Sequence, residues 1–223
     1  MAQTIDLGIG GLTCAPGDHI CGVYRGDAER DKITFPYIEA ALRAANKCIC
    51  IVDLDDPTEI VDAVRNIVDA SLLADSNQFD AVRASDAFLR SDGSFVVPEI
   101  LSVWKAMISD AMYVGRFDLV QIVGCFSRNY VRPDPSALLM LESEVNRLLP
   151  LFPQVALCLY DLEHYDASIV IDLVKTHPKI LLEGMVYENP YFMTPDELLA
   201  ATAANEVSEI PDGVRELADR VTA

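Results

Sequence analysis

Short apolar runs recur along the chain, and they are separated by stretches in which apolar residues return at helical spacing. The clearest run is residues 154–161, QVALCLYD, where apolar or aromatic side chains fill every position between Gln154 and Asp161. A run of this length without alternation is typical of a strand buried on both faces of a sheet. The same pattern predicts further strands at residues 19–24, 48–53, 118–124 and 179–186.

The stretches between these runs carry apolar residues three and four positions apart, which indicates helices. Residues 56–59 (DPTE) and 194–197 (TPDE) resemble capping boxes and predict helix starts. Pro36 is expected to start or kink the helix in which it lies. Helices are predicted over residues 33–45, 57–72, 96–113, 134–149, 166–177 and 211–221, with a short strand near residues 81–84.

Strands that alternate with helices in this way predict an α/β fold with a mostly parallel central sheet and helices on both faces. At 223 residues the chain suits one domain, and it contains no internal repeat and no dividing linker. We expect a single domain over residues 1–223, with a core at 14–200 and an acidic helical extension at 201–223. Ligands of such sheets bind outside the carboxyl ends of the strands.

Acidic residues dominate the charge. The chain holds 35 Asp and Glu against 17 Lys and Arg, so its formal net charge is −18. Such a field repels a phosphate backbone or an anionic lipid surface, which argues against direct binding to nucleic acid or membrane. The amino end has no signal-peptide pattern, and no apolar run approaches about 18 residues. Four of the six cysteines lie within apolar runs, where a free thiol behaves as a small hydrophobe, so we expect a reducing cytoplasm.

The turn after the first predicted strand lacks a phosphate-binding loop. A nucleotide-binding chain of this architecture normally places GxxxxGK[ST] there, with backbone N–H groups and a lysine around the phosphates. Here the turn after Tyr24 reads RGDAERDK, with one glycine and three acids. These acids would repel a triphosphate. The sequence therefore predicts the scaffold of a nucleotide hydrolase without the part that holds the nucleotide.

Several segments, in their order and spacing, resemble the MEDS domain, a methanogen/methylotroph sensory domain of prokaryotic signalling proteins. The matching segments are residues 17–21 (GDHIC) with Tyr24, 35–38 (FPYI), 156–161 (ALCLYD), 176–178 (THP) and 187–191 (YENPY). The resemblance covers about residues 14–200. It implies a RecA/KaiC-like three-layer sandwich that has lost its phosphate loop. It also implies a role in sensing small hydrocarbon derivatives, usually beside a DNA-binding or histidine-kinase output.

The chain departs from that pattern at two places. Residues 125–127 (CFS) stand where relatives carry an acid and a tryptophan, and no helix-turn-helix or kinase segment fits after residue 200. We therefore expect a partner protein, a kinase or a transcription factor, to supply the output. A homodimer is an open alternative, and no cofactor is predicted.

Two residues of the first strand are candidates for contact with a ligand. His19 and Cys21 are two positions apart in a strand, so their side chains share one face. Cys48 and Cys50 do the same in the next strand. If these strands pair, the four residues form an alternative metal site, although the familiar paired CxxC spacing is absent. The preferred hypothesis is that His19 and Cys21 line a small-molecule pocket and that no metal is bound.

The strand ends supply further candidates. Tyr24, Asp53, Asp55, Cys125 and Asp161 are expected to face a common crevice. Asp161, with Glu163 and His164 nearby, either forms an acid/base pair or metal site or merely caps the following turn.

The segment 187–192 (YENPYF) places aromatic rings around Asn189 and Pro190, which suits the wall of a small apolar pocket. The alternative is that Tyr191 and Phe192 only pack the last helix onto the sheet. If the segment forms a pocket wall, substituting Asn189 should weaken ligand binding more than folding. The predicted ligand-binding residues are His19, Cys21, Tyr24, Cys125, Tyr160, Asp161, Tyr187, Asn189 and Tyr191.

Three functions follow from these features. The first is a regulatory sensor without catalytic activity, which binds a small organic molecule and signals to a partner through a shift in population. The second is a thiol- or metal-dependent enzyme that uses His19, Cys21 and Asp161. The third is an interaction module whose acidic carboxyl-terminal helices dock a basic partner.

Overall fold

The computed structural model describes residues 4–68, 77–126 and 131–203. Its centre is a seven-stranded sheet in the order β5-β4-β6-β7-β3-β8-β9. Every pair is parallel except β8 and β9. The predicted α/β class with a mostly parallel sheet is therefore confirmed. The five neighbouring strands from one edge of the sheet to β3 are, in chain order, β3 (His19–Tyr24), β4 (Lys47–Val52), β5 (Phe79–Arg83), β6 (Val120–Phe126) and β7 (Gln154–Asp161).

The predicted bounds of the strands at residues 19–24 and 154–161 agree with β3 and β7. The strands predicted at residues 48–53, 81–84 and 118–124 differ from β4, β5 and β6 by one or two residues at each end. Every residue of β4, β6 and β7 is buried. These strands lie inside the sheet with helices on both faces, so neither face needs polar residues. This arrangement explains why the sequence shows apolar runs rather than alternation.

The single strand predicted at residues 179–186 is wrong. The structure places two strands there, β8 (Lys179–Leu182) and β9 (Met185–Glu188), which pair antiparallel as a hairpin. The two residues between them, Glu183 and Gly184, have φ values of 50° and 71°. A two-residue loop with positive φ at both positions matches the twist of the flanking strands. The glycine inside the apolar run marked this turn.

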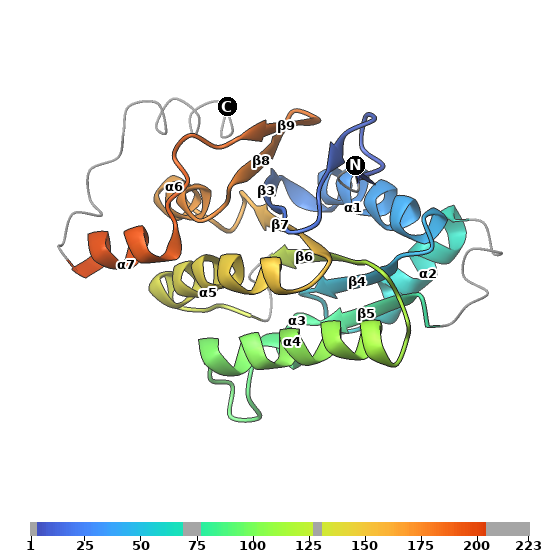
Figure 1. Cartoon of the computed structure of the whole chain (residues 1–223), viewed down its shortest axis with the longest axis horizontal. Helices are drawn as coiled ribbons and strands as arrows, with labels where there is room; N and C mark the ends of the chain where they lie inside the picture. Colours follow the sequence, from blue (N-terminus) through green and yellow to red (C-terminus); the bar gives the residue numbers. More distant parts are fainter. Residues whose placement is uncertain (1–3, 69–76, 127–130, 204–223) are drawn as a thin grey trace.

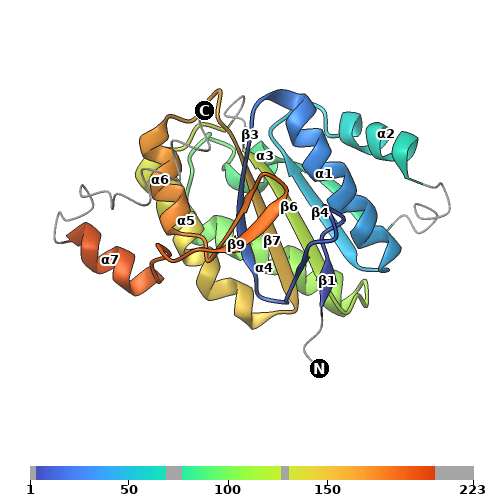
Figure 2. The ribbon, with the colours of Figure 1, turned by 90° about the horizontal axis from the view of Figure 1, so that it is seen from above.

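Helices cover the sheet on both faces, as Figures 1 and 2 show. One face carries α1 (Gly26–Arg43) and α2 (Thr58–Ile67), whose apolar residues share a core with β3, β4, β6 and β7. The other face carries a second core under the remaining helices of the sandwich. They are α3 (Ala84–Phe88), α4 (Val97–Tyr113), α5 (Pro135–Leu148) and α6 (Ala167–Lys175), with a 3₁₀ turn at Leu149–Leu151.

Pro36 lies in the interior of α1, which begins at Gly26, so of the two predicted alternatives Pro36 does not start the helix. The arm before β3 forms a small two-stranded sheet of β1 (Ile5–Asp6) and β2 (Thr13–Cys14). Gly8 in this arm has φ of 71°, and a Cβ there would lie 2.0 Å from the backbone oxygen of Pro36. Only glycine allows the arm to approach α1 so closely.

Side-chain caps fix the starts of several helices. Asp134 and Asp166 accept hydrogen bonds from backbone N–H groups in the first turns of α5 and α6. Before α7 (Pro195–Ala203), Thr194 and Glu197 bond each other's backbone N–H groups, which confirms that capping box. The helix predicted at residues 211–221 lies outside the described residues.

Candidate functional site: a buried polar cluster beside β3 and β7

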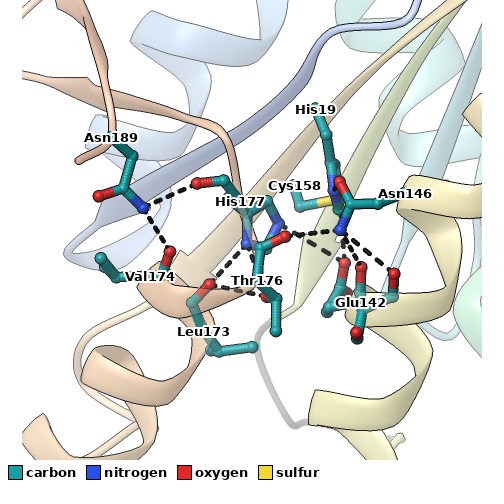
Figure 3. A network of polar contacts seen from close by, with 10 residues as sticks. His19, Glu142, Asn146, Cys158, Leu173, Val174, Thr176, His177 and Asn189 are labelled. Atoms are coloured by element: carbon teal, nitrogen blue, oxygen red, sulfur yellow. Dashed lines mark hydrogen bonds and ion pairs between the residues drawn. The ribbon is translucent and has the colours of Figure 1, made fainter. Parts of the chain in front are cut away.

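Four reactive side chains converge on the sheet face that α5 and α6 cover (Figure 3). β3 supplies His19, β7 supplies Cys158, α5 supplies Glu142, and the turn between α6 and β8 supplies His177. All four are at most 3 % exposed. Each residue offers one nitrogen, oxygen or sulfur atom, and these four atoms all lie within 4.8 Å of one another. Segments far apart in the sequence thus meet at one point inside the protein.

Asn146 fixes the orientation of His19. It lies one turn after Glu142 in α5, and its Nδ2 donates to the carbonyl oxygens of Glu142, Ser143 and Thr176 at 3.1, 3.2 and 2.7 Å. Its Oδ1 must therefore be the atom that faces Nδ1 of His19, 3.1 Å away. An amide oxygen only accepts, so Nδ1 of His19 carries a proton. Nε2 of His19 points instead toward Glu142 and Cys158, at 3.3 and 3.4 Å.

His177 is oriented in the same way by a backbone carbonyl. Its Nδ1 donates to the carbonyl oxygen of Leu173 at 2.7 Å. Burial, reinforced by the neighbouring His19, lowers the pKa of His177 to about 3, although Glu142 opposes the shift. The ring is therefore neutral near pH 7, and its Nε2 carries a lone pair. This Nε2 has no hydrogen-bond partner among the described residues and lies 3.5 Å from Oε2 of Glu142.

Glu142 carries the negative charge of the cluster. Burial alone would raise the pKa of this carboxyl group. Interactions with the neighbouring His19 and His177 outweigh burial and lower its pKa below the ordinary value. The pKa of the Cys158 thiol is well above its ordinary value, mainly because of burial and then because of Glu142. A carboxylate, a thiol and the Nε2 atoms of two imidazoles thus face one another.

Tyr160 closes the cluster on the side of the carboxyl strand ends. Its ring stacks on Phe126, with centroids 5.3 Å apart, and meets His177 edge to face at 6.0 Å. Burial and then the charge of Glu142 raise the pKa of Tyr160 well above its ordinary value. The hydroxyl therefore keeps its proton beside the carboxylate.

The alternative metal site at His19, Cys21, Cys48 and Cys50 is wrong as a single cluster. β4 and β3 do not pair, because β6 and β7 lie between them. His19 and Cys21 do share a face, but Cys48 and Cys50 belong to the core on the opposite face. Cys21 lies beside Cys158, its register partner on β7.

Three of the five residues expected at a common crevice lie near one another. Tyr24 and Cys125 belong to the core on the α1 face, and Asp161 is close enough to Tyr24 to raise the pKa of its hydroxyl. Asp53 is buried and accepts a hydrogen bond from the backbone N–H of Val131, and Asp55 is exposed. Tyr160, another predicted ligand-binding residue, lies on the α5 face, so the predicted ligand-binding residues are divided between the two faces.

Asp161 has the contacts of a turn cap. Its Oδ1 accepts from the backbone N–H of Glu163 at 3.0 Å, and its carbonyl oxygen accepts from the N–H groups of His164 and Tyr165. Oδ2 lies 3.2 Å from Nδ1 of His164. The structure thus brings the predicted acid/base pair into contact, and it also gives Asp161 the capping role that was the alternative.

Asn189 ties backbone segments together. Its Nδ2 donates to the carbonyl oxygens of Val174 and His177 at 2.7 and 2.8 Å, and its Oδ1 accepts from the N–H of Tyr191 at 3.0 Å. These contacts hold the end of β9 against the end of α6 (Figure 3). Tyr187 is 41 % exposed, and its hydroxyl donates to Sδ of Met185 at 3.4 Å.

The sequence alone did not point to Glu142 or Asn146. Glu142 lies four residues after Leu138 and three before Val145, so it falls on the buried stripe of α5. A charged residue on an apolar stripe is rare without a partner, and this was the signal available in the sequence.

These features define an α/β domain with a mostly parallel, helix-covered sheet and a buried cluster of two histidines, a glutamate and a cysteine. Residues 18–178 match the family MEDS, the MEthanogen/methylotroph, DcmR Sensory domain, and the chain belongs to that family. It is also similar to the transcriptional repressor DcmR of Methylorubrum extorquens, at 25 % identity over 175 residues. The matched region covers 76 % of this chain and 61 % of that repressor. Across the residues described, no helix is long and apolar enough to cross a membrane.

Proposed function

We propose that the chain is the sensory part of a regulator: it binds a small, mostly uncharged organic molecule and passes the change to a partner protein. Membership of a sensory family and the similarity to a transcriptional repressor support a regulatory role. Signalling then requires only that the ligand binds one arrangement of the protein more tightly than another. The partner is a kinase or a transcription factor.

The start of α1 supports an uncharged ligand. In a nucleotide-binding α/β protein, the first helix presents its free N–H groups to a phosphate. Here Asp27 and Glu29 lie in the first turn, and Oε2 of Glu29 accepts from the backbone N–H of Arg25 at 2.8 Å. The guanidinium of Arg30 is paired with Asp27 and Asp31. The chain's own carboxylates thus pair with donors at the start of this helix, and their negative charge would repel a phosphate.

The observation that carries the proposal is the buried hydroxyl of Tyr24. Tyr24 is the last residue of β3, and its hydroxyl has no hydrogen-bond partner among the described residues. Burial, then the neighbouring Cys125 and Asp161, raise the pKa of Tyr24, so the group remains an O–H donor. Leaving such a donor unpaired costs about 1–3 kcal/mol. A ligand with one acceptor atom, such as a carbonyl or ether oxygen, would remove that cost.

The surroundings of Tyr24 suit an apolar guest. Cys125 lies at the carboxyl end of β6, and its Sγ is 3.7 Å from Oγ1 of Thr34 on α1. A hydrogen bond with the Cys50 thiol lowers the pKa of Cys125. Soft thiols, one hydroxyl and aliphatic residues of the same core offer dispersion contacts and few charges.

A ligand screen with two tyrosine variants tests the proposal. Thermal shift against small alcohols, ketones, amides and halogenated hydrocarbons should reveal a compound that stabilises the protein, by about 2.7 kcal/mol at 100 times its Kd. Tyr24→Phe should weaken that compound about tenfold or more, because it removes the donor. Tyr37→Phe is the matched control, since the Tyr37 hydroxyl already donates to the carbonyl oxygen of Ile122 at 3.2 Å.

Equal affinity of the wild type and Tyr24→Phe would place the ligand elsewhere. Hydrolysis of a nucleoside triphosphate above background, or a screen and native mass spectrometry that reveal no small molecule, would reject the sensor function itself.

A further inference from the structure

The cluster of His19, Glu142, Cys158 and His177 has the spacing of a metal coordination sphere. Zinc in proteins binds His nitrogen, carboxylate oxygen and thiolate sulfur at about 2.0–2.3 Å, so tetrahedral ligands lie about 3.3–3.7 Å from one another. The candidate ligand atoms lie 3.3 Å apart for His19–Glu142, 3.5 Å for His177–Glu142 and 3.4 Å for His19–Cys158. Two nitrogens, one oxygen and one sulfur, all within 4.8 Å of one another, are thus close enough together to bind one ion.

The hydrogen-bond partners of the two histidines are of the kind that orients a histidine for metal binding. Ligating imidazoles almost always donate their other N–H to a carbonyl, carboxylate or water, which fixes the tautomer and aims the lone pair at the ion. The Nδ1 atoms of both histidines are used in this way, by Oδ1 of Asn146 and by the carbonyl oxygen of Leu173. Both Nε2 atoms consequently turn inward.

Two inward-facing atoms lack a hydrogen bond within the described chain, Nε2 of His177 and Oε2 of Glu142. Both are acceptors in the neutral-imidazole state, and two acceptors 3.5 Å apart repel each other. A buried polar atom without a protein partner is usually satisfied by a bound water or ion. Here several electron-pair donors face inward, which favours a cation over water.

Charge balance favours a divalent ion. On binding, the Cys158 S–H bond breaks, a metal–sulfur bond forms and one proton leaves to solvent. One thiolate, the Glu142 carboxylate and two neutral imidazoles then exactly offset a charge of +2. A neutral assembly suits a site whose residues are all buried, whereas a lone buried carboxylate does not.

We propose that these four residues bind one Zn²⁺ ion as a closed, four-coordinate site. Four protein ligands leave no open position for substrate, as in structural zinc sites. The ion would join α5 and the α6–β8 turn to β3 and β7, across segments far apart in the sequence. It lies on the sheet face opposite Tyr24 and does not depend on the proposed ligand.

Cobalt substitution and elemental analysis test the site. The full chain, purified under reducing conditions, should contain one zinc per chain. Because the site is buried, protein unfolded with chelator and refolded with Co²⁺ should take up the ion during folding. It should then show the near-ultraviolet charge-transfer band of a cobalt–thiolate bond. A refolded wild type with no stoichiometric zinc and no such band would overturn the proposal, and this result needs no variant.

Matched variants assign the ligands. Cys158→Ser should abolish the thiolate band, whereas Cys21→Ser, at the neighbouring buried position on β3, should keep it. His177→Gln should lose most of the metal, whereas His164→Gln, whose side chain is 40 % exposed and pairs with Asp161, should retain it. Circular dichroism establishes that each variant is folded. A thiolate band that persists in folded Cys158→Ser, or disappears only in Cys21→Ser, would exclude the assigned ligands.

Discussion

The two faces of the sheet hold their unpaired buried polar atoms in different ways. On the α5 face, the hydrogen bonds of Asn146, Asn189 and the Nδ1 atoms of both histidines fix the surroundings of Nε2 of His177 and Oε2 of Glu142, which have no hydrogen bond in the described chain. On the α1 face, the hydroxyl of Tyr24 lies buried without a hydrogen bond. Both arrangements lie beside the same strand, β3, whose successive side chains alternate between the faces.

We interpret this difference as a division between a structural role of one face and a ligand-sensing role of the other. On the α5 face, several hydrogen bonds fix the positions of the elements, and the proposed zinc would satisfy the two inward-facing atoms that remain unpaired. A buried donor without a partner instead lowers the stability of the free protein, and a ligand that supplies the missing acceptor removes this cost. We therefore interpret the α5 face as the rigid part of the protein and the Tyr24 corner as the part that responds.

The largest effect is expected for Asn146→Ala. This change removes the donor to the Thr176 carbonyl and the acceptor that orients His19, so unfolding free energy should fall by about 3 kcal/mol. The proposed zinc should also bind about 10–100-fold more weakly, as for other groups behind a metal ligand. Urea denaturation and metal competition measure both effects. Glu144→Ala on the same helix, a partly exposed residue paired with Arg147, should change stability by about 0.5 kcal/mol at most. Equal effects of the two changes would contradict a special role for the network.

Asn189→Ala should have the next largest effect, a loss of about 2 kcal/mol, because it leaves the carbonyls of Val174 and His177 without their donor. This prediction differs from the expectation from sequence, that if the segment forms a pocket wall, substitution here would weaken ligand binding more than folding. Thermal unfolding decides between them, with Tyr187→Phe as a neighbouring control that should stay within about 0.5 kcal/mol. Unchanged stability together with weakened ligand binding would restore the pocket-wall hypothesis.

The sequence predicted the sheet well because buried parallel strands leave an unambiguous trace. Continuous apolar runs such as QVALCLYD have no alternative amphipathic interpretation, and the run at residues 154–161 coincides with β7. The hairpin of β8 and β9 was missed because its two turn residues, Glu183 and Gly184, are flanked directly by apolar residues on both sides, so the segment resembles one strand. Two residues with positive φ decide the topology there, and hydrophobic pattern does not encode φ.

The site was harder to predict than the fold for a related reason. His19 was recognised, but its partners come from α5 and from the turn after α6, and no local spacing links these segments. The cysteines at 48 and 50 were assigned to His19 on the assumption that consecutive strands pair. The chain instead places β6 and β7 between β4 and β3, a crossover that only the packing of the helices determines.

The smallest effect, and the sharpest contrast, is expected for two tyrosines of the α1 face in the absence of ligand. Tyr37→Phe should lower unfolding free energy by about 1 kcal/mol, because it removes the bond to the Ile122 carbonyl. Tyr24→Phe should leave stability unchanged or raise it slightly, because the deleted hydroxyl has no hydrogen bond in the described chain. Urea unfolding of both variants beside the wild type measures the difference. Equal losses of unfolding free energy would mean that the Tyr24 hydroxyl already has a hydrogen bond in the free protein. The distinction between a rigid face and a responsive face would then be wrong.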